Sequence, residues 1–563
     1  MEVKKFTIGI ASIALTLILV ACQDSTSKNE DAETFKATVN KTIVSGKIKG
    51  HMDKKNDVIE WLGVPYAKSP VSELRWKAPQ KADKWEKTKD VSKYGDTAIQ
   101  FSNGEVKGSE DALNLDVVRP NNSKKDLPVV VYLHGGNNQS GTSQEIKGNT
   151  IVNDIDAVYV SVNYRLGALG FNPLEALKTG SKEENSGNYS LLDIAAALDW
   201  VMANAETFGG NKDNITLTGF SAGGRDVMAT LISPIFKNKY NKAISFSGGM
   251  TLADNDVSQE IFAKAIAPLA VEDKKKDTVE AAQKWLLSKD KAVGDYLNSI
   301  KAERLAPLMG NAGIRMSVFP HLYKDGYVIP KEGFETSKYN DVPVMLVTGT
   351  SEFSMFTAFD KTFMEDFMSG NLFKDQEKLA EFNYSKTYGS QLYRLSNGVD
   401  SAKQMANKYK SPIYVTEIAY GDNKEVTPKL SQSLGSFHGI FEPMLQTPSN
   451  YKDFIGESFE NDGAKEMSKQ FKLYLKSFIE NGDPNQAKLP KWDDFTSDNQ
   501  VLSIDADKSK SKIIATKDQE TADDILLKMK NDNTLTQEQK EDLNKNVLNG
   551  RWFSNPIDSL YNK

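Results

Sequence analysis

Short apolar runs recur along the chain with longer helix-like stretches between them, and this alternation is the strongest constraint on its fold. Helix-period stretches such as 191–208 and 467–479 end shortly before glycine. The apolar runs have the composition of strands buried on both faces and lie at 129–133, 158–162, 215–218, 243–246, 344–347 and 413–418. The pattern favours an α/β fold with a mostly parallel sheet and helices on both faces. Ligands in such sheets bind at the carboxyl ends of the strands.

Length and composition limit the classes of protein that this chain can belong to. Its 563 residues are 39% hydrophobic and 26% charged, without an internal repeat, so we expect one large domain over 41–563. A net charge of -6 provides no positive field for a nucleic acid, and no nucleic-acid partner is expected. One cysteine cannot form an internal disulfide, and four histidines leave little material for a metal site. We therefore expect no metal, no cofactor and chemistry by an oxygen nucleophile.

The amino terminus has the pattern of a secretion signal. Two lysines, Lys4 and Lys5, precede an uncharged apolar run that ends at Ala21, which predicts a signal peptide over 1–21. The sole cysteine, Cys22, follows Leu-Val-Ala, a pattern that resembles the bacterial lipobox and predicts lipid attachment at Cys22. The alternative is an ordinary signal with an incidental cysteine. Residues 22–40 are polar and are expected to form a disordered tether, so the predicted location is the outer face of the cell membrane.

A Gly-x-Ser-x-Gly motif lies at the end of one predicted strand. Gly219-Phe220-Ser221-Ala222-Gly223 follows the strand at 215–218 and precedes a helix-like stretch at 226–232. This setting is typical of a nucleophile elbow, whose strained turn projects the serine hydroxyl and whose glycines avoid backbone collisions. The motif predicts that Ser221 is the nucleophile.

A serine that attacks a carbonyl needs backbone N–H groups aimed at the oxygen that becomes charged. His134-Gly135-Gly136-Asn137-Asn138 follows the strand at 129–133 and is placed to supply them. We expect the amides of Gly136, Asn137 and Ala222 to form this oxyanion hole. The alternative is an ordinary glycine turn.

The serine also needs a base, and the chain has four histidines. His51 lies in the polar amino-terminal region, His134 precedes the expected oxyanion loop, and His321 has no catalytic context. His438 follows the strand at 413–418 and keeps the order serine, acid, histidine of α/β-hydrolases, so it is the predicted base.

The acid that orients the base is expected after the strand at 344–347, where Glu352 lies. A carboxylate there would accept the Nδ1–H of the histidine and stabilise the imidazolium. Asp341 and Asp360 are the nearby rivals, and a surface role for Glu352 is the remaining alternative.

Further motifs occur in order between Thr42 and Trp492. They are Gly63-Val64-Pro65-Tyr66-Ala67, Leu74-Arg75-Trp76-Lys77-Ala78-Pro79, Ser109-Glu110-Asp111-Ala112-Leu113-Asn114-Leu115, Asn163-Tyr164-Arg165-Leu166-Gly167 and Gly187-Asn188-Tyr189-Ser190-Leu191-Leu192-Asp193. With the elbow and its partners, they resemble the type-B carboxylesterases, which include bacterial para-nitrobenzyl esterases and the cholinesterases.

The resemblance implies an α/β-hydrolase fold and ester cleavage by a Ser-Glu-His triad, here Ser221, Glu352 and His438. It also implies buried ion pairs and a supporting hydroxyl near the triad, here Arg75 with Glu110, Arg165 with Asp193, and Ser247.

The chain departs from the family pattern close to these residues. Phe220 stands where relatives usually have glutamate, and Asn137-Asn138 replaces Gly-Phe, so substrate preference and the shape of the oxyanion hole could differ. Other departures are Phe353 for glycine, Ile440-Phe441 where acids are common, and Ala98 and Ala112 at the positions of the family's early cysteines.

The predicted function is hydrolysis of small-molecule carboxylic esters through an acyl-enzyme on Ser221. The alternative is a solute-binding or adhesion lipoprotein without catalysis. The sequence leaves the acyl and alcohol groups and the oligomeric state open. Arg225 and Arg315 are the nearest residues that could hold an anionic substrate, although a structural or surface role is the simpler reading of each.

Overall fold

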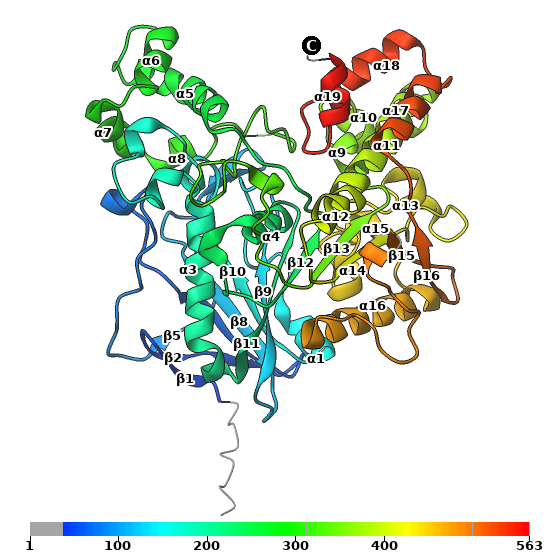
Figure 1. Ribbon diagram of the computed structural model, residues 1–563, viewed down its shortest axis with the longest axis horizontal. Helices are drawn as coiled ribbons and strands as arrows, with labels where there is room; N and C mark the ends of the chain where they lie inside the picture. The colour runs from blue at the N-terminus through cyan, green and yellow to red at the C-terminus, as the bar shows by residue number, and fades with distance from the viewer. Residues whose placement is uncertain (1–37, 311, 498, 562–563) are drawn as a thin grey trace, which may run out of the picture.

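An eleven-stranded sheet forms the centre of the computed structural model, which describes residues 38–310, 312–497 and 499–561 (Figure 1). The predicted signal peptide, Cys22 and most of the predicted tether lie outside the described residues. The strand order is β16-β15-β14-β13-β12-β11-β9-β10-β8-β4-β3. These strands are β3 (His51–Asp53), β4 (Val58–Pro65), β8 (Asn114–Pro120), β9 (Leu127–Leu133), β10 (Val158–Val162), β11 (Gly210–Phe220), β12 (Lys242–Phe246), β13 (Val344–Gly349), β14 (Ile413–Ile418), β15 (Gln500–Ala506) and β16 (Ser511–Lys517).

The middle of the sheet is parallel and its edges are antiparallel. Strands β10, β9, β11, β12, β13, β14 and β15 pair in parallel, whereas β8, β4 and β3 at one edge and β16 at the other pair antiparallel. All six apolar runs predicted as strands are confirmed, and each lies in the parallel part. Two small sheets lie apart from it, one of β1 (Asn40–Ile43), β2 (Gly46–Lys49) and β5 (Lys89–Asp90), the other of β6 (Gln100–Ser102) and β7 (Glu105–Lys107).

Helices cover both faces of the parallel strands. Every residue of β9, β10, β12 and β13 is buried, so neither face of these strands meets solvent. Both α4 and α16 contact β9 and β11. The helices that contact the sheet include α1 (Val152–Ile155), α3 (Tyr189–Asn204), α4 (Ala222–Ile232), α11 (Gln376–Asn397), α12 (Val399–Ala406) and α16 (Asp462–Asn481). The short helix α2 (Gly167–Gly170) packs on α3, and α14 (Glu442–Leu445) packs on α16.

The remaining helices lie mainly beyond the sheet, in two groups at the upper left and right of Figure 1. The left group is α5 (Asn255–Glu272), α6 (Val279–Leu286), α7 (Lys291–Ser299) and α8 (Ala302–Leu305). The right group is α9 (Ser354–Ala358), α10 (Met364–Ser369), α17 (Ala522–Asn531), α18 (Gln537–Leu543) and α19 (Asn555–Tyr561), with α13 (Pro428–Ser433) and α15 (Lys452–Ile455) below it. Within the described part of the chain, no helix combines the length and apolarity needed to cross a membrane.

Candidate active site

Ser221 lies in the tight turn between β11 and α4, where the motif predicts the nucleophile. Its backbone angles, φ 56° and ψ -116°, are strained for a residue with a side chain. A Cβ on Gly219 would lie 2.4 Å from the backbone of Gly223, and a Cβ on Gly223 would lie 2.2 Å from the carbonyl oxygen of Leu133. The turn can therefore form only with glycine at both positions, and it leaves Ser221 5% exposed.

Glu352 and His438 meet at the carboxyl ends of the parallel strands. Glu352 Oε2 lies 2.5 Å from His438 Nδ1, and Glu352 has no solvent exposure. Its other oxygen, Oε1, accepts hydrogen bonds from Ser247 Oγ (2.5 Å), Thr348 Oγ1 (3.0 Å) and the Gly349 amide (2.7 Å). These donors fix the carboxylate so that Oε2 can accept the Nδ1–H, which leaves the proton off Nε2.

Aromatic rings enclose the His438 imidazole. The ring centroids of Phe220, Phe356 and Tyr393 lie 4.7, 5.0 and 5.6 Å from that of the imidazole. Because Phe220 is the neighbour of Ser221 in the chain, the imidazole packs directly beside the elbow.

His438 Nε2 is buried and has no hydrogen-bond partner among the described residues. The nitrogen that a base would use is thus unoccupied by any structural bond of the protein.

The other three histidines have structural partners. His51 Nε2 lies 2.9 Å from Glu60 on the antiparallel edge of the sheet. Burial lowers the pKa of His134 to about 4 and that of His321 well below its usual value. His321 Nε2 accepts a hydrogen bond of 2.8 Å from Arg225, a fully enclosed guanidinium that also stacks on Trp552 at 4.0 Å. Arg225 is therefore a structural residue.

The loop after β9 carries three consecutive residues with positive φ, Gly136 (95°), Asn137 (57°) and Asn138 (54°). Within the described residues, the amides of Gly136, Asn137 and Ala222 donate no hydrogen bond to the protein. Asn138 anchors the loop because its Nδ2 donates to Asp226 Oδ1 at 2.9 Å. Burial raises the pKa of Asp226 to about 7. Asn137 Nδ2 likewise donates to Gln139 Oε1 at 2.7 Å, so the backbone angles that glycine takes freely are adopted here by two asparagines with hydrogen-bonded side chains.

The rival acids are engaged elsewhere. Asp341 accepts a hydrogen bond from the Ser411 amide at 2.8 Å, and Asp360 pairs with Arg551 at 2.8 Å. Of the three carboxylates considered from the sequence, Glu352 is therefore the one that contacts His438.

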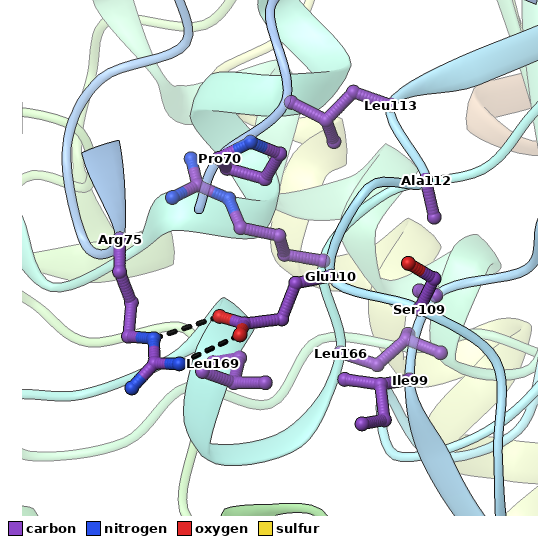
Figure 2. Close-up of a pocket in the computed structure, with 11 residues that line it drawn as sticks. Pro70, Arg75, Ile99, Ser109, Glu110, Ala112, Leu113, Leu166 and Leu169 are labelled. Carbon is purple, nitrogen blue, oxygen red and sulfur yellow. Dashed lines mark hydrogen bonds and ion pairs between the residues drawn. The ribbon is translucent and has the colours of Figure 1, made fainter. Parts of the chain in front are cut away.

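Both ion pairs implied by the family resemblance form. Arg75 Nε and Nη2 donate to Glu110 at 2.7 and 2.6 Å, as Figure 2 shows, and Arg165 binds Asp193 at 2.8 and 2.7 Å. The cavity beside Arg75 and Glu110 has a volume of only about 10 Å³, enough for about one water molecule. This pocket is too small to hold an ester, so the ion pair between Arg75 and Glu110 has a structural role.

Phe220 continues into a cluster of aromatic rings. Its ring packs edge-to-face on Phe441 at 5.0 Å, and Phe441 stacks on Phe246 at 4.2 Å. Phe220 and Phe441, two of the residues expected to depart from the family pattern, thus contact each other and form a packed apolar wall beside the imidazole.

Four residues around His438 and Glu352 were not predicted from the sequence. Tyr393 and Phe356 contact the imidazole from α11 and α9, and Thr348 binds the carboxylate. Phe553, near the carboxyl end of the chain, stacks on Tyr393 at 5.0 Å. Only Thr348, at the end of a predicted strand, could have been found from its position.

The fold and the elbow define a class, that of the α/β-hydrolases. Within that class the chain belongs to the carboxylesterase family, whose model matches residues 34–522. Para-nitrobenzyl esterase of Bacillus subtilis (strain 168) is 26% identical over 484 residues, which cover 82% of this chain and 94% of that protein. Carboxylesterase 1D of Rattus norvegicus is 28% identical over 504 residues, which cover 80% of this chain and 86% of the relative.

A solved structure described as PNB esterase has the same fold. Its TM-score is 0.68 at 24% identity, over 86% of this chain and 99% of the solved one. The chain is accordingly an enzyme of the carboxylesterase class that hydrolyses carboxylic esters. The family match gives no support to a solute-binding or adhesion protein without catalysis.

Proposed function

We propose that the enzyme cleaves esters through an acyl-enzyme on Ser221, with His438 as general base and Glu352 as the acid that orients it. The observation that carries this assignment is the 2.5 Å contact between Glu352 Oε2 and His438 Nδ1 beside the elbow. In this mechanism Nε2 takes the proton from the Ser221 hydroxyl as the oxygen attacks the ester carbonyl. In the described structure no hydrogen bond joins Ser221 Oγ to His438 Nε2, which has no protein partner. The serine and the base commonly align fully only when substrate is bound.

The reaction then proceeds in two halves. The imidazolium donates its proton to the departing alcohol, and the acyl group stays on Ser221. His438 next activates a water molecule, which releases the carboxylic acid and restores the serine. Glu352 remains ionised throughout and stabilises the imidazolium.

The amides of Gly136, Asn137 and Ala222 are assigned as the donors that stabilise the negative charge on the carbonyl oxygen. Each has no acceptor within the described protein, and the Ala222 amide stands at the first turn of α4, where the helix dipole also favours negative charge. Donors held in place before the reaction stabilise the transition state without reorganisation.

The assignment is tested with a nitrophenyl ester under pre-steady-state conditions. Wild-type enzyme should release a burst of nitrophenolate equal to the active-site concentration when deacylation is slower than acylation. Ser221→Ala should abolish the burst and lower kcat by about 10⁶. Ser233→Ala is the matched control, because Ser233 is equally buried and its hydroxyl has no described partner. Turnover by Ser221→Ala at more than a hundredth of the wild-type rate would refute the assignment.

We also propose that Cys22 carries a lipid that anchors the enzyme to the outer face of the cell membrane. The proposal depends on the signal-like run and the lipobox-like Leu-Val-Ala-Cys alone. Cys22→Ser should move the enzyme from the membrane fraction to the medium, as followed by immunoblotting. Unchanged membrane association would contradict it.

A further inference from the structure

A second feature of the molecule lies next to the imidazole and is not used by the proposed mechanism. It is a cavity of about 740 Å³ between the α9–α10 region and the carboxyl-terminal segment. Phe356, which packs on His438 at 5.0 Å, is one of its walls. The cavity therefore adjoins the catalytic base across the thickness of one ring.

The charged lining of this cavity is almost entirely basic. Arg315, Lys361, Lys545 and Arg551 line it, and Asp360 is the only carboxylate among its lining residues. This excess of cations occurs in a chain whose net charge is -6. We call this feature the cationic pocket.

The two arginines are held side by side by the backbone. Arg315 and Arg551 are paired in an antiparallel β-bridge, and the Trp552 amide donates to the Ile314 carbonyl at 3.1 Å. Both guanidiniums approach the same oxygen of Asp360, Arg551 at 2.8 Å and Arg315 at 3.6 Å. One carboxylate thus serves two cations. Burial and the neighbouring Arg315 lower the pKa of Arg551 to about 9. Other N–H groups of the two guanidiniums donate to backbone carbonyls of Gly313 and of residues 546, 547 and 549.

The two lysines lie at the exposed side of the pocket. Neither Lys361 nor Lys545 forms an ion pair with any carboxylate in the described parts of the chain. Their ammonium groups are free to face a ligand.

The rest of the lining is apolar and suits the hydrocarbon part of a substrate. Phe356, Phe359 and Met364 contribute to the wall, and the last two are 40% and 47% exposed. An apolar wall with cations at its rim fits an organic anion better than a neutral ester or a cation.

Part of this pocket is formed by the carboxyl-terminal segment of the chain. Lys545 and Arg551 lie beyond residue 522, where the family match ends. Arg551 packs over Phe353, the residue after Glu352, at 5.1 Å, so the carboxyl-terminal segment meets the loop that carries the acid.

From these observations we propose that the cationic pocket binds an anionic group of the substrate, so that the enzyme prefers esters bearing a carboxylate or phosphate beyond the scissile bond. This inference builds on the proposed function, because the ester bond must lie at Ser221 while the anion lies past Phe356.

The test uses mono-4-nitrophenyl esters of dicarboxylic acids with two to five methylene groups. The methyl-capped diesters of the same length are the neutral partners. The quantity compared is the ratio of kcat/KM for the anionic ester to kcat/KM for its neutral partner. Wild-type enzyme should favour the anion at the chain length that spans Phe356, and 0.5 M NaCl should reduce the preference.

The double variant Lys361→Gln with Lys545→Gln should lower this ratio about 5- to 10-fold and leave the neutral ester unaffected. Glutamate at both positions should reverse the preference. The matched control is Lys54→Gln with Lys87→Gln, which makes the same charge change at two exposed lysines near β3 and β5.

A wild-type ratio near one at every length, or equal ratios in the test and control variants, would overturn the inference. Failure of the proposed function has a different result, which is turnover of both esters by Ser221→Ala.

Discussion

Replacing Glu352 by glutamine tests how the acid controls the protonation of His438. Oε1 of Glu352 receives three hydrogen bonds, one of them from the Gly349 amide, whose direction is fixed by the backbone. A glutamine must place its oxygen there, because the opposite orientation would set an NH₂ group against that amide. An unsatisfied buried amide costs about 1–3 kcal/mol.

The glutamine NH₂ would then face His438 Nδ1 at the position where Oε2 now lies 2.5 Å away. Nδ1 must accept this hydrogen bond, so the imidazole proton moves to Nε2. A protonated Nε2 cannot accept the proton of Ser221, and the base is lost in the neutral imidazole. We expect kcat to fall by about 10⁴, the size of loss that the wrong tautomer causes in serine proteases.

The assay is steady-state hydrolysis of a nitrophenyl ester, with melting temperature measured in parallel. Glu442→Gln is the matched control. Glu442 is also buried, and it accepts hydrogen bonds from Ser449 and from the Asn450 amide without touching His438. The control should keep activity within about threefold of wild type. Glu352→Gln enzyme with a native melting temperature and more than a tenth of wild-type kcat would refute the reasoning.

Three further predictions concern the oxyanion loop and the buried charges. Gly136→Ala should lower kcat by about 10² to 10³ with little change in KM. The new Cβ would lie 2.1 Å from the Ser140 carbonyl oxygen and would displace the loop. An unchanged kcat would show that the Gly136 amide is not a donor. Asp193→Ala should lower the free energy of unfolding by about 3–5 kcal/mol in urea titrations, because it leaves Arg165 buried without its carboxylate. A loss below about 1 kcal/mol would contradict this prediction. Burial raises the pKa of Glu145 to about 7. Between pH 4.5 and 7 the folded state therefore holds a proton that the unfolded state has released. The free energy of unfolding should fall by up to about 3 kcal/mol as the pH rises through this range. Glu145→Gln should remove this part of the fall, and parallel pH profiles for the two proteins would contradict it.

Six of the seven parallel strands and the elbow could be predicted because their signals are local, whereas the partly exposed β15 was missed. A buried parallel strand is a continuous apolar run, and a nucleophile elbow requires glycines at fixed spacing. Glu352 could be predicted as the acid from its position, because it lies shortly after the end of β13. Its contact with His438 distinguishes it from Asp341 and Asp360, which the sequence left open.

The edge strands were missed because their burial depends on distant partners. Strand β8 is entirely buried although it contains Asp116 and Arg119. Arg119 is accommodated because its guanidinium donates to the carbonyl of Phe208, 89 positions along the chain, and to that of Lys124. The sequence of the strand does not indicate such a hydrogen bond, so its polar residues would predict a solvent-exposed strand.

The aromatic enclosure of the His438 imidazole was missed for a similar reason. Tyr393 lies on α11 and Phe553 lies 160 positions further along the chain, and their stacking at 5.0 Å arises only from the packing of the carboxyl-terminal segment. A lone aromatic residue on a helix usually belongs to a core. The Asn137 and Asn138 backbone angles also depended on the hydrogen bond between Asn138 and Asp226, which lies on α4.

The most direct measurement of the central claim is covalent labelling with a fluorophosphonate, followed by mass spectrometry of the peptides. The mechanism predicts one phosphonyl group per enzyme on Ser221, no label in Ser221→Ala, and labelling slowed by several orders of magnitude in His438→Ala. A label on another residue, or continued ester turnover after Ser221 is fully labelled, would contradict the claim that this serine carries the acyl group.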